Sequence, residues 1–96
     1  MTVSALALSK KDNVATAVRP LESGADVAID VEDSIISVVL TQSIPLGHKF
    51  ALRDIEPGES IIKYGETVGR ATVGISKGEH VHIHNVEGLR GRGDRA

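Results

Sequence analysis

The sequence has 96 residues, which is the size of one small domain with a thin hydrophobic core. Apolar residues make up 41% of it, but Phe50 and Tyr64 are the only aromatic ones, and cysteine is absent. A disulfide scaffold, a thiolate metal site and a cysteine nucleophile are therefore excluded. Eleven basic and thirteen acidic residues give a net charge of −2, which does not support a nucleic-acid-binding surface.

No stretch of the sequence approaches the roughly 18 apolar residues that a membrane span needs. The first eight residues also lack the basic start and long apolar run of a secretion signal. The expectation is a cytoplasmic domain without a membrane partner.

The first predicted element is a short helix over residues 13–19. Ser9 or Asp12 supplies its N-cap, Val14 and Val18 share one face, and Pro20 ends it. The remaining predicted elements are short strands over 26–31, 34–41, 49–53, 60–63, 67–71 and 79–85. The run over 34–41 is dense in β-branched residues and is typical of a buried strand. A tight turn at Tyr64-Gly65 joins two of the strands.

Three seven-residue segments repeat one pattern. Each begins and ends with an apolar residue and has Gly at its centre. They are 21–27, 55–61 and 75–81. Each predicts a turn with its glycine at positive φ, leading into a strand. Their unequal spacing excludes a solenoid, and two readings stay open: repeated corners of one compact domain, or a pattern common to many β proteins.

The histidines are the strongest chemical signal. His80, His82 and His84 alternate with Val81 and Ile83, so a strand would carry the imidazoles on one face and the apolar pair in the core. Imidazoles spaced in this way can converge on one divalent metal ion, although the solvated face of an edge strand gives the same pattern.

The fourth histidine lies in the segment Gly47-His48-Lys49, which is predicted to be a turn feeding a strand. An imidazole at this place can ligate a metal or move a proton near neutral pH. The ammonium of Lys49 can hold the carboxylate of an acidic substrate. An ordinary charged surface loop is the alternative.

The segments Ile44-Pro45-Leu46-Gly47-His48-Lys49, Lys63-Tyr64-Gly65 and His82-Ile83-His84-Asn85, in this order, resemble the SAF (β-clip) domain of the UxaA family of altronate and galactarate dehydratases. The resemblance covers roughly residues 10–94 and extends to the small subunit of sulfolactate sulfo-lyase. It implies a mostly β, β-clip (SAF-like) fold with short strands, Gly-rich corners and at most one or two short helices. Many relatives have an aromatic residue where this chain has His80, so His80 is the less certain member of the motif.

The resemblance also implies a function. The chain is expected to be the small subunit, or the N-terminal domain, of a carbon-oxygen or carbon-sulfur lyase that eliminates water or sulfite from a hydroxy acid. Its partner would be a large catalytic subunit, and it is not expected to be active alone. A divalent metal (Fe²⁺, Mn²⁺ or Mg²⁺) is expected for the complex. A non-catalytic sugar-acid-binding or assembly module with the same fold is the alternative, and self-association of the chain is left open.

Roles follow for individual residues under this resemblance. His48 and His84 are predicted to be catalytic, and Lys49 and Asn85 to bind the substrate. His48, His82 and His84 are predicted to ligate the metal, with His80 a weaker candidate. The chain divides into an N-terminal segment (1–9), the SAF domain (10–86) and a Gly- and Arg-rich tail (87–96) predicted to be flexible or to dock on the partner.

Overall fold

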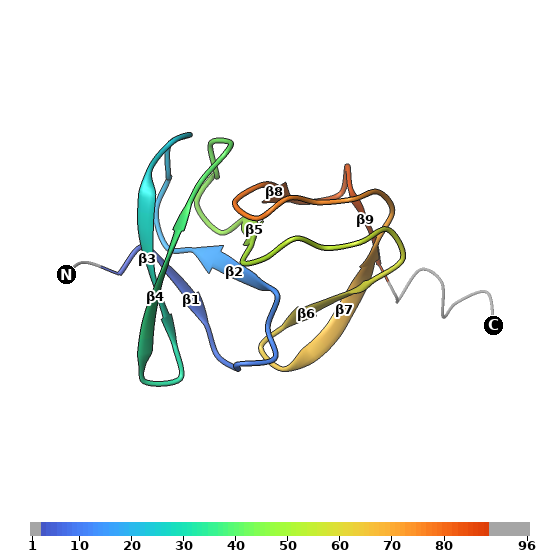
Figure 1. Ribbon diagram of the computed structural model, residues 1–96, viewed down its shortest axis with the longest axis horizontal. Helices are drawn as coiled ribbons and strands as arrows, with labels where there is room; N and C mark the ends of the chain where they lie inside the picture. The colour runs from blue at the N-terminus through green and yellow to red at the C-terminus, as the bar shows by residue number, and fades with distance from the viewer. Residues whose placement is uncertain (1–2, 89–96) are drawn as a thin grey trace.

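The computed structural model describes residues 3–88 and arranges them in two β-sheets that lie side by side (Figure 1). The strands are β1 (Ala5–Ala7), β2 (Val14–Ala17), β3 (Asp26–Val31), β4 (Ser34–Val39), β5 (Lys49–Ala51), β6 (Ser60–Lys63), β7 (Glu66–Ala71), β8 (His80–Val81) and β9 (Val86–Gly88). One sheet has the order β4-β3-β1-β2-β5-β8 and the other the order β6-β7-β9. The predicted mostly-β fold class is confirmed. Within residues 3–88 no helix is long and apolar enough to cross a membrane.

The helix predicted over residues 13–19 is wrong, because the segment forms strand β2. Antiparallel pairing with β1 and with β5 places β2 in the middle of the larger sheet. Val14 and Ala15 are both buried, one on each face of the strand, in two separate hydrophobic clusters. A seven-residue helix buries one stripe only, whereas small and β-branched residues suit a strand that is covered on both faces.

The other predicted strands agree with the structure to within a few residues, with two corrections. Strand β4 is not a buried strand: it is the edge of the larger sheet, and Ile35, Ile36 and Val39 are exposed. The segment predicted as one strand over 79–85 extends only through His80–Val81 and then turns.

The predicted glycine corners are confirmed, and the turn predicted at Gly47 has the same geometry. Gly24, Gly58 and Gly78 have φ between 85° and 86°, and Gly47 has a φ of 82°. In each corner the residue after the glycine donates a backbone hydrogen bond to the residue three positions earlier. This is the geometry of a type II turn, which requires positive φ at its third residue. The apolar residues that begin the corners pair two by two, Leu21 with Ile44 and Ile55 with Ile75.

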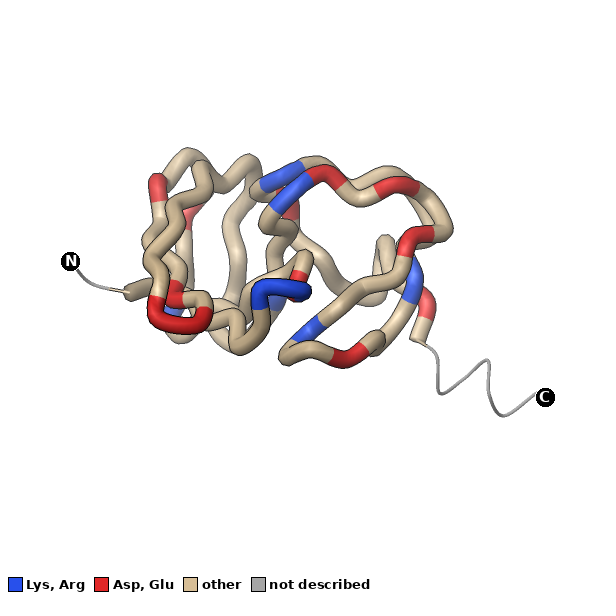
Figure 2. Tube along the Cα trace, turned by 60° about the horizontal axis from the view of Figure 1, so that its bottom comes forward, with Lys and Arg blue, Asp and Glu red and all other residues tan. Residues whose placement is uncertain are grey.

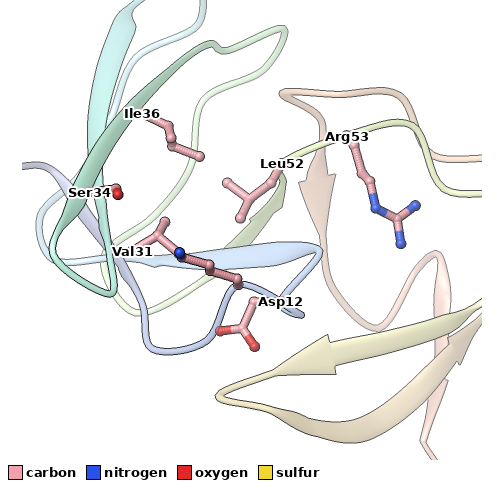
Figure 3. Close-up of a pocket in the computed structure, with 7 residues that line it drawn as sticks. Asp12, Val31, Ser34, Ile36, Leu52 and Arg53 are labelled. Atoms are coloured by element: carbon pink, nitrogen blue, oxygen red, sulfur yellow. The ribbon is translucent and has the colours of Figure 1, made fainter.

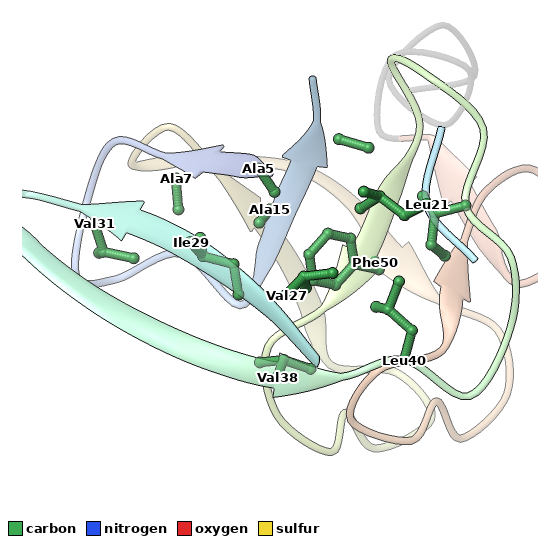
Figure 4. Packing of buried hydrophobic residues seen from close by; sticks show 12 residues of the cluster. Ala5, Ala7, Ala15, Leu21, Val27, Ile29, Val31, Val38, Leu40 and Phe50 are labelled. Carbon is green, nitrogen blue, oxygen red and sulfur yellow. The ribbon is translucent and has the colours of Figure 1, made fainter. Parts of the chain in front are cut away.

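Two hydrophobic clusters hold the sheets together. The first is enclosed by the larger sheet, and Phe50 is fully buried at its centre among aliphatic side chains of β1, β2, β3 and β4 (Figure 4). The second joins the two sheets and contains Val14, Ala51, Ile55, Ile61, Ala71, Ile75 and Val81.

Both ends of the described chain belong to the sheets. Strand β1 lies in the segment predicted to precede the domain, and β9 reaches into the first residues of the predicted tail. The rest of that tail, residues 89–96, lies outside the described residues. In the view of Figure 2, acidic and basic positions are interspersed along the chain.

Candidate functional site

Three histidines meet beside the larger sheet. Nδ1 of His48 and Nε2 of His80 are 2.9 Å apart and share a hydrogen bond. The rings of His48 and His82 stack with their centroids 4.1 Å apart. One nitrogen atom from each of the three rings lies within 4.8 Å of the others, and we call these three residues the histidine triad.

The strand pairing explains why residues 32 positions apart meet. Strands β5 and β8 are antiparallel, with Phe50 opposite His80 and Lys49 opposite Val81. His48 leaves the Gly47 corner just before β5, and His80 leaves the Gly78 corner at the start of β8. Extending this register by one residue sets His48 opposite His82 and diagonal to His80, so the three imidazoles meet across the strand pair.

A buried asparagine brings the third imidazole into place. The side-chain oxygen of Asn85 accepts a hydrogen bond from the backbone N–H of His82, and its side-chain nitrogen donates to the backbone carbonyl of His80. The backbone of Asn85 also closes the turn by donating to the carbonyl of His82. Asn85 is 1% exposed, and its side chain holds the backbone of two histidines in place. The substrate contact predicted for Asn85 stays a prediction.

The turn ends the alternation that the sequence suggested. Val81 is buried as expected, but Ile83 is 84% exposed and does not point into the core. His84 lies next to His80, with ring centroids 5.3 Å apart, and is outside the triad. The structure thus groups His48 and His82 with His80, the member considered less certain, rather than with His84.

The triad favours neutral imidazoles. Burial lowers the pKa of His80, and repulsion from His48, His84, His82 and Lys49 lowers it further. The pKa of His82 is also lowered, by burial and by its proximity to His48 and Lys49. A neutral imidazole is the form that binds a metal, so these shifts keep the donor atoms available at lower pH.

These shifts predict an acid-sensitive fold. In the metal-free chain, the NMR titration midpoints of His80 and His82 are expected below the ordinary histidine value of about 6.5. Because the unfolded chain then binds more protons than the folded one, the free energy of unfolding should fall as the pH drops below about 6.5. Urea unfolding at about pH 7.5 and about pH 5.5, with a chelator present, measures the effect. Midpoints above the ordinary value would contradict it.

Lys49 and His82 both line a surface hollow of about 190 Å³. The hollow is lined by Lys49, His82, Ile83, Val86 and Gly88. Burial lowers the pKa of Lys49, and the nearby Lys63 acts in the same direction. A ligand carboxylate in the hollow would offset both effects, which fits the anion-binding role predicted for Lys49.

The donor set of the triad fits a transition metal. Two imidazole ligands on one ion lie about 3.0–3.4 Å apart, since metal–nitrogen bonds are about 2.1 Å long. The His48 and His80 nitrogens are 2.9 Å apart, and one nitrogen from each of the three rings lies within 4.8 Å of the others. Three nitrogen donors suit Fe²⁺ better than Mn²⁺, and they suit Mg²⁺ least, because Mg²⁺ prefers oxygen ligands.

A larger cavity lies away from the triad and was not anticipated from the sequence. Its volume is about 310 Å³, and Val31, Ile36 and Leu52 provide apolar walls, with Lys10, Asp12, Ser34 and Arg53 around them (Figure 3). Arg53 is already engaged, since its guanidinium lies 2.7 Å from the carboxylate of Glu59. Asp12 accepts hydrogen bonds from the backbone N–H groups of Tyr64 and Gly65, so it links the two sheets.

Comparison with known proteins bears on what the site does. The family described as the altronate/galactarate dehydratase SAF domain matches residues 3–89. The altronate dehydratase of Escherichia coli (strain K12) is 46% identical over 74 residues, which are 77% of this chain and 14% of that protein. The altronate dehydratase of Bacillus subtilis (strain 168) is 38% identical over 89 residues and is covered over 16% of its length.

Two smaller relatives are more similar in size. The (2R)-sulfolactate sulfo-lyase subunit alpha of Chromohalobacter salexigens is 42% identical over 59 residues, 62% of this chain and 63% of that protein. The subunit of the same name from Paracoccus pantotrophus is 36% identical over 59 residues and is covered over 88% of its length. The chain therefore spans a small part of the dehydratases and most of the length of the alpha subunits.

Proposed function

Because the chain belongs to the family of altronate/galactarate dehydratase SAF domains, we propose that it is the small subunit, or the N-terminal domain, of a lyase acting on a hydroxy acid. Its relatives are lyases, and two of them are alpha subunits. The partner in this proposal is a large subunit that carries the remainder of the active site. The observation that carries the proposal is the histidine triad beside the Lys49 hollow.

The triad is the proposed metal site of the complex. His48, His80 and His82 would hold a divalent ion, with Fe²⁺ favoured by the donor set. Such an ion supplies Lewis-acid polarisation of the substrate's oxygen atoms and of the departing group. The remaining coordination positions would face the large subunit, because Asn85 and the sheet close the inner side.

Lys49 is the proposed carboxylate anchor. Elimination next to a carboxylate builds negative charge on that group as the α-proton leaves, and a fixed ammonium stabilises that charge. The hollow places Lys49 and His82 on one surface, so the anchor and a triad ligand can act on the same substrate. The base that removes the α-proton is assigned to the large subunit. His84, beside the triad, is a candidate for proton transfer to the leaving group.

Metal binding by the chain tests the first half of the proposal. Alanine substitution of His48, His80 or His82 is expected to weaken binding of Fe²⁺, or of Co²⁺ as a spectroscopic probe, by at least about 100-fold. The matched control is His84→Ala, expected to change affinity less than about threefold because His84 is outside the triad. Isothermal titration and the Co²⁺ absorption spectrum measure both. Equal losses in all four variants would contradict the triad assignment.

Activity of the reconstituted complex tests the second half. Together with a family large subunit, the chain is expected to support elimination from a sugar acid such as altronate or from sulfolactate. Lys49→Met should raise KM and also lower kcat, because Lys49 is proposed both to hold the carboxylate and to stabilise the charge that builds on it, whereas His80→Ala should abolish turnover. Substrate binding by the chain alone, with no metal dependence and no effect of the histidine variants, would instead favour a non-catalytic sugar-acid-binding module.

A further inference from the structure

Two large aliphatic side chains are exposed at the tips of the turns that carry the histidine triad. Ile83 is 84% exposed and Leu46 is 60% exposed, and neither belongs to a hydrophobic cluster of the core. Ile83 directly follows His82, and Leu46 lies two residues before His48. We call Leu46 and Ile83 the apolar tips. Singly exposed apolar residues are common on protein surfaces, so it is the position of the apolar tips that needs an explanation.

Leu46 occupies the second position of its turn. The N–H of His48 donates to the carbonyl of Pro45, so the turn runs from Pro45 to His48 with Leu46 second and Gly47 third. At the equivalent position the other three glycine corners hold Ser23, Pro57 and Lys77. Turns favour polar residues, glycine and proline, and the other corners follow this preference. Turn chemistry therefore does not account for an exposed leucine at the corner that carries a triad histidine.

Ile83 occupies the same position in a second turn. The N–H of Asn85 donates to the carbonyl of His82, so Ile83 is the second residue of the turn from His82 to Asn85. The side chain of Asn85 fixes this turn through its two bonds to the backbone of His82 and His80. In Figure 1 the turn projects as a narrow tip between β8 and β9. A well-bonded turn thus presents a β-branched apolar side chain outward, beside a triad histidine.

The surface of Ile83 is continuous with the candidate site. The hollow of about 190 Å³ is lined by Ile83 together with Lys49, His82, Val86 and Gly88. Its apolar wall therefore extends outward to the tip of the turn. The inner side of the triad is closed by Asn85 and by the pairing of β5 with β8. Because the triad offers only three nitrogen donors, further ligands for a bound ion must approach from the outer side, beside Ile83.

We infer that the apolar tips insert into an apolar recess of the large subunit, an inference that rests on the proposed function. The occupant follows from continuity with the triad, since the large subunit is the chain that completes the metal site and supplies the base in that proposal. Removing aliphatic surface from water drives such docking, and fully desolvated side chains near the centre of an interface carry most of its binding energy. The two tips would thereby set the position of the triad relative to the residues of the large subunit.

Affinity for a purified large subunit of a family lyase tests this inference. Ile83→Ala and Leu46→Ala are each expected to raise the Kd at least about tenfold, because each removes most of the aliphatic surface that docking buries. Ile35→Ala and Leu8→Ala are the matched controls, since Ile35 is 51% and Leu8 is 61% exposed. Ile35 lies on β4, at the opposite edge of the larger sheet from β8, and Leu8 directly follows β1. Both controls should change the Kd less than about twofold in isothermal titration.

Further measurements separate docking from the other roles of these residues. The Co²⁺ affinity of both tip variants is expected to stay within about threefold of the unaltered chain, since neither tip is a triad member. Weakened Co²⁺ binding would make the tips supports of the triad and overturn the inference. Unchanged affinity of both variants for the large subunit would overturn the inference alone, whereas no binding by the unaltered chain would overturn the proposed function as well. If sedimentation shows that the variants lose self-association instead, the tips belong to a contact with a second copy, which also overturns it.

Discussion

Gly78→Ala is expected to destabilise the chain by about 2–4 kcal/mol, a large part of the total for a domain of this size. A Cβ on Gly78 would lie 2.2 Å from the carbonyl oxygen of Val39 and 3.3 Å from Cα of Leu40, so backbone must move to admit it. The φ of +86° adds the cost of a left-handed conformation, about 1 kcal/mol for a residue with a side chain. Urea unfolding followed by circular dichroism measures the loss.

Gly58→Ala is the matched control for this prediction. Gly58 has a φ of +85° in an equivalent corner, but nothing lies within 4 Å of its Cβ position. Its substitution should therefore cost only the conformational part, about 1 kcal/mol. The Gly78 variant should also weaken metal binding, because its corner leads directly into His80, whereas the Gly58 variant should not. Equal destabilisation by the two would contradict the close contact at Val39.

Asn13→Ala is expected to cost about 3 kcal/mol, because Asn13 joins the two sheets through a fully buried side chain. Its side-chain nitrogen donates to the carbonyl of Ser60, and its side-chain oxygen accepts from the N–H of Ile62. Truncation leaves two backbone groups of β6 without these partners, and each unpaired buried group costs about 1–3 kcal/mol. Denaturant unfolding measures the loss, and hydrogen exchange should show reduced protection of the Ile62 amide.

The comparison variant is Asn85→Ala, since Asn85 is also buried and also bonds twice to backbone. Its partners are His80 and His82, within five residues, so it organises one turn rather than the contact between sheets. Asn85→Ala should weaken metal binding about 10- to 100-fold, as loss of a supporting group around ligands does. Asn13→Ala should leave metal binding unchanged while the chain is folded. The reverse pattern would contradict these two roles.

Local chemistry made much of the fold predictable. The alternation of polar and apolar residues predicted β3. The turn residues Tyr64 and Gly65, which have φ of 55° and 81°, predicted the hairpin between β6 and β7. Apolar residues spaced around glycine marked three corners, and the same spacing runs from Ile44 to Phe50. That fourth corner was predicted as a turn feeding a strand, but its likeness to the other three was not recognised from the sequence.

Non-local pairing decided what the sequence did not reveal. Whether residues 13–19 form a helix or a strand depends on pairing with β1 on one side and with β5, which is distant in sequence, on the other. The exposure of β4 likewise depends on its place at the edge of the sheet, which a run of β-branched residues does not encode.

The sequence predicted that histidines form the candidate site, but not which of the four histidines come together. The alternation rule assumes that the strand continues through residue 85, and it then groups His82 with His84. The side chain of Asn85 instead bonds to the backbone of His82 and closes a turn, and His84 then lies beside His80 but outside the triad. Side-chain bonding of asparagine to nearby backbone is a recognised competitor of strand structure, and here it selects which imidazoles meet.

The four glycine corners have a consequence for protein engineering. Each presents two rim positions directly after its glycine, and these hold Ala25-Asp26, His48-Lys49, Glu59-Ser60 and Glu79-His80. The backbone at the corners is nearly the same, and of these eight residues Ala25 is the one that packs against a hydrophobic cluster of the core. The positions after the corner glycines are therefore suited to protein engineering. Metal-binding side chains such as those of His48 and His80 could be exchanged, removed or copied to another corner while the sheets stay unchanged.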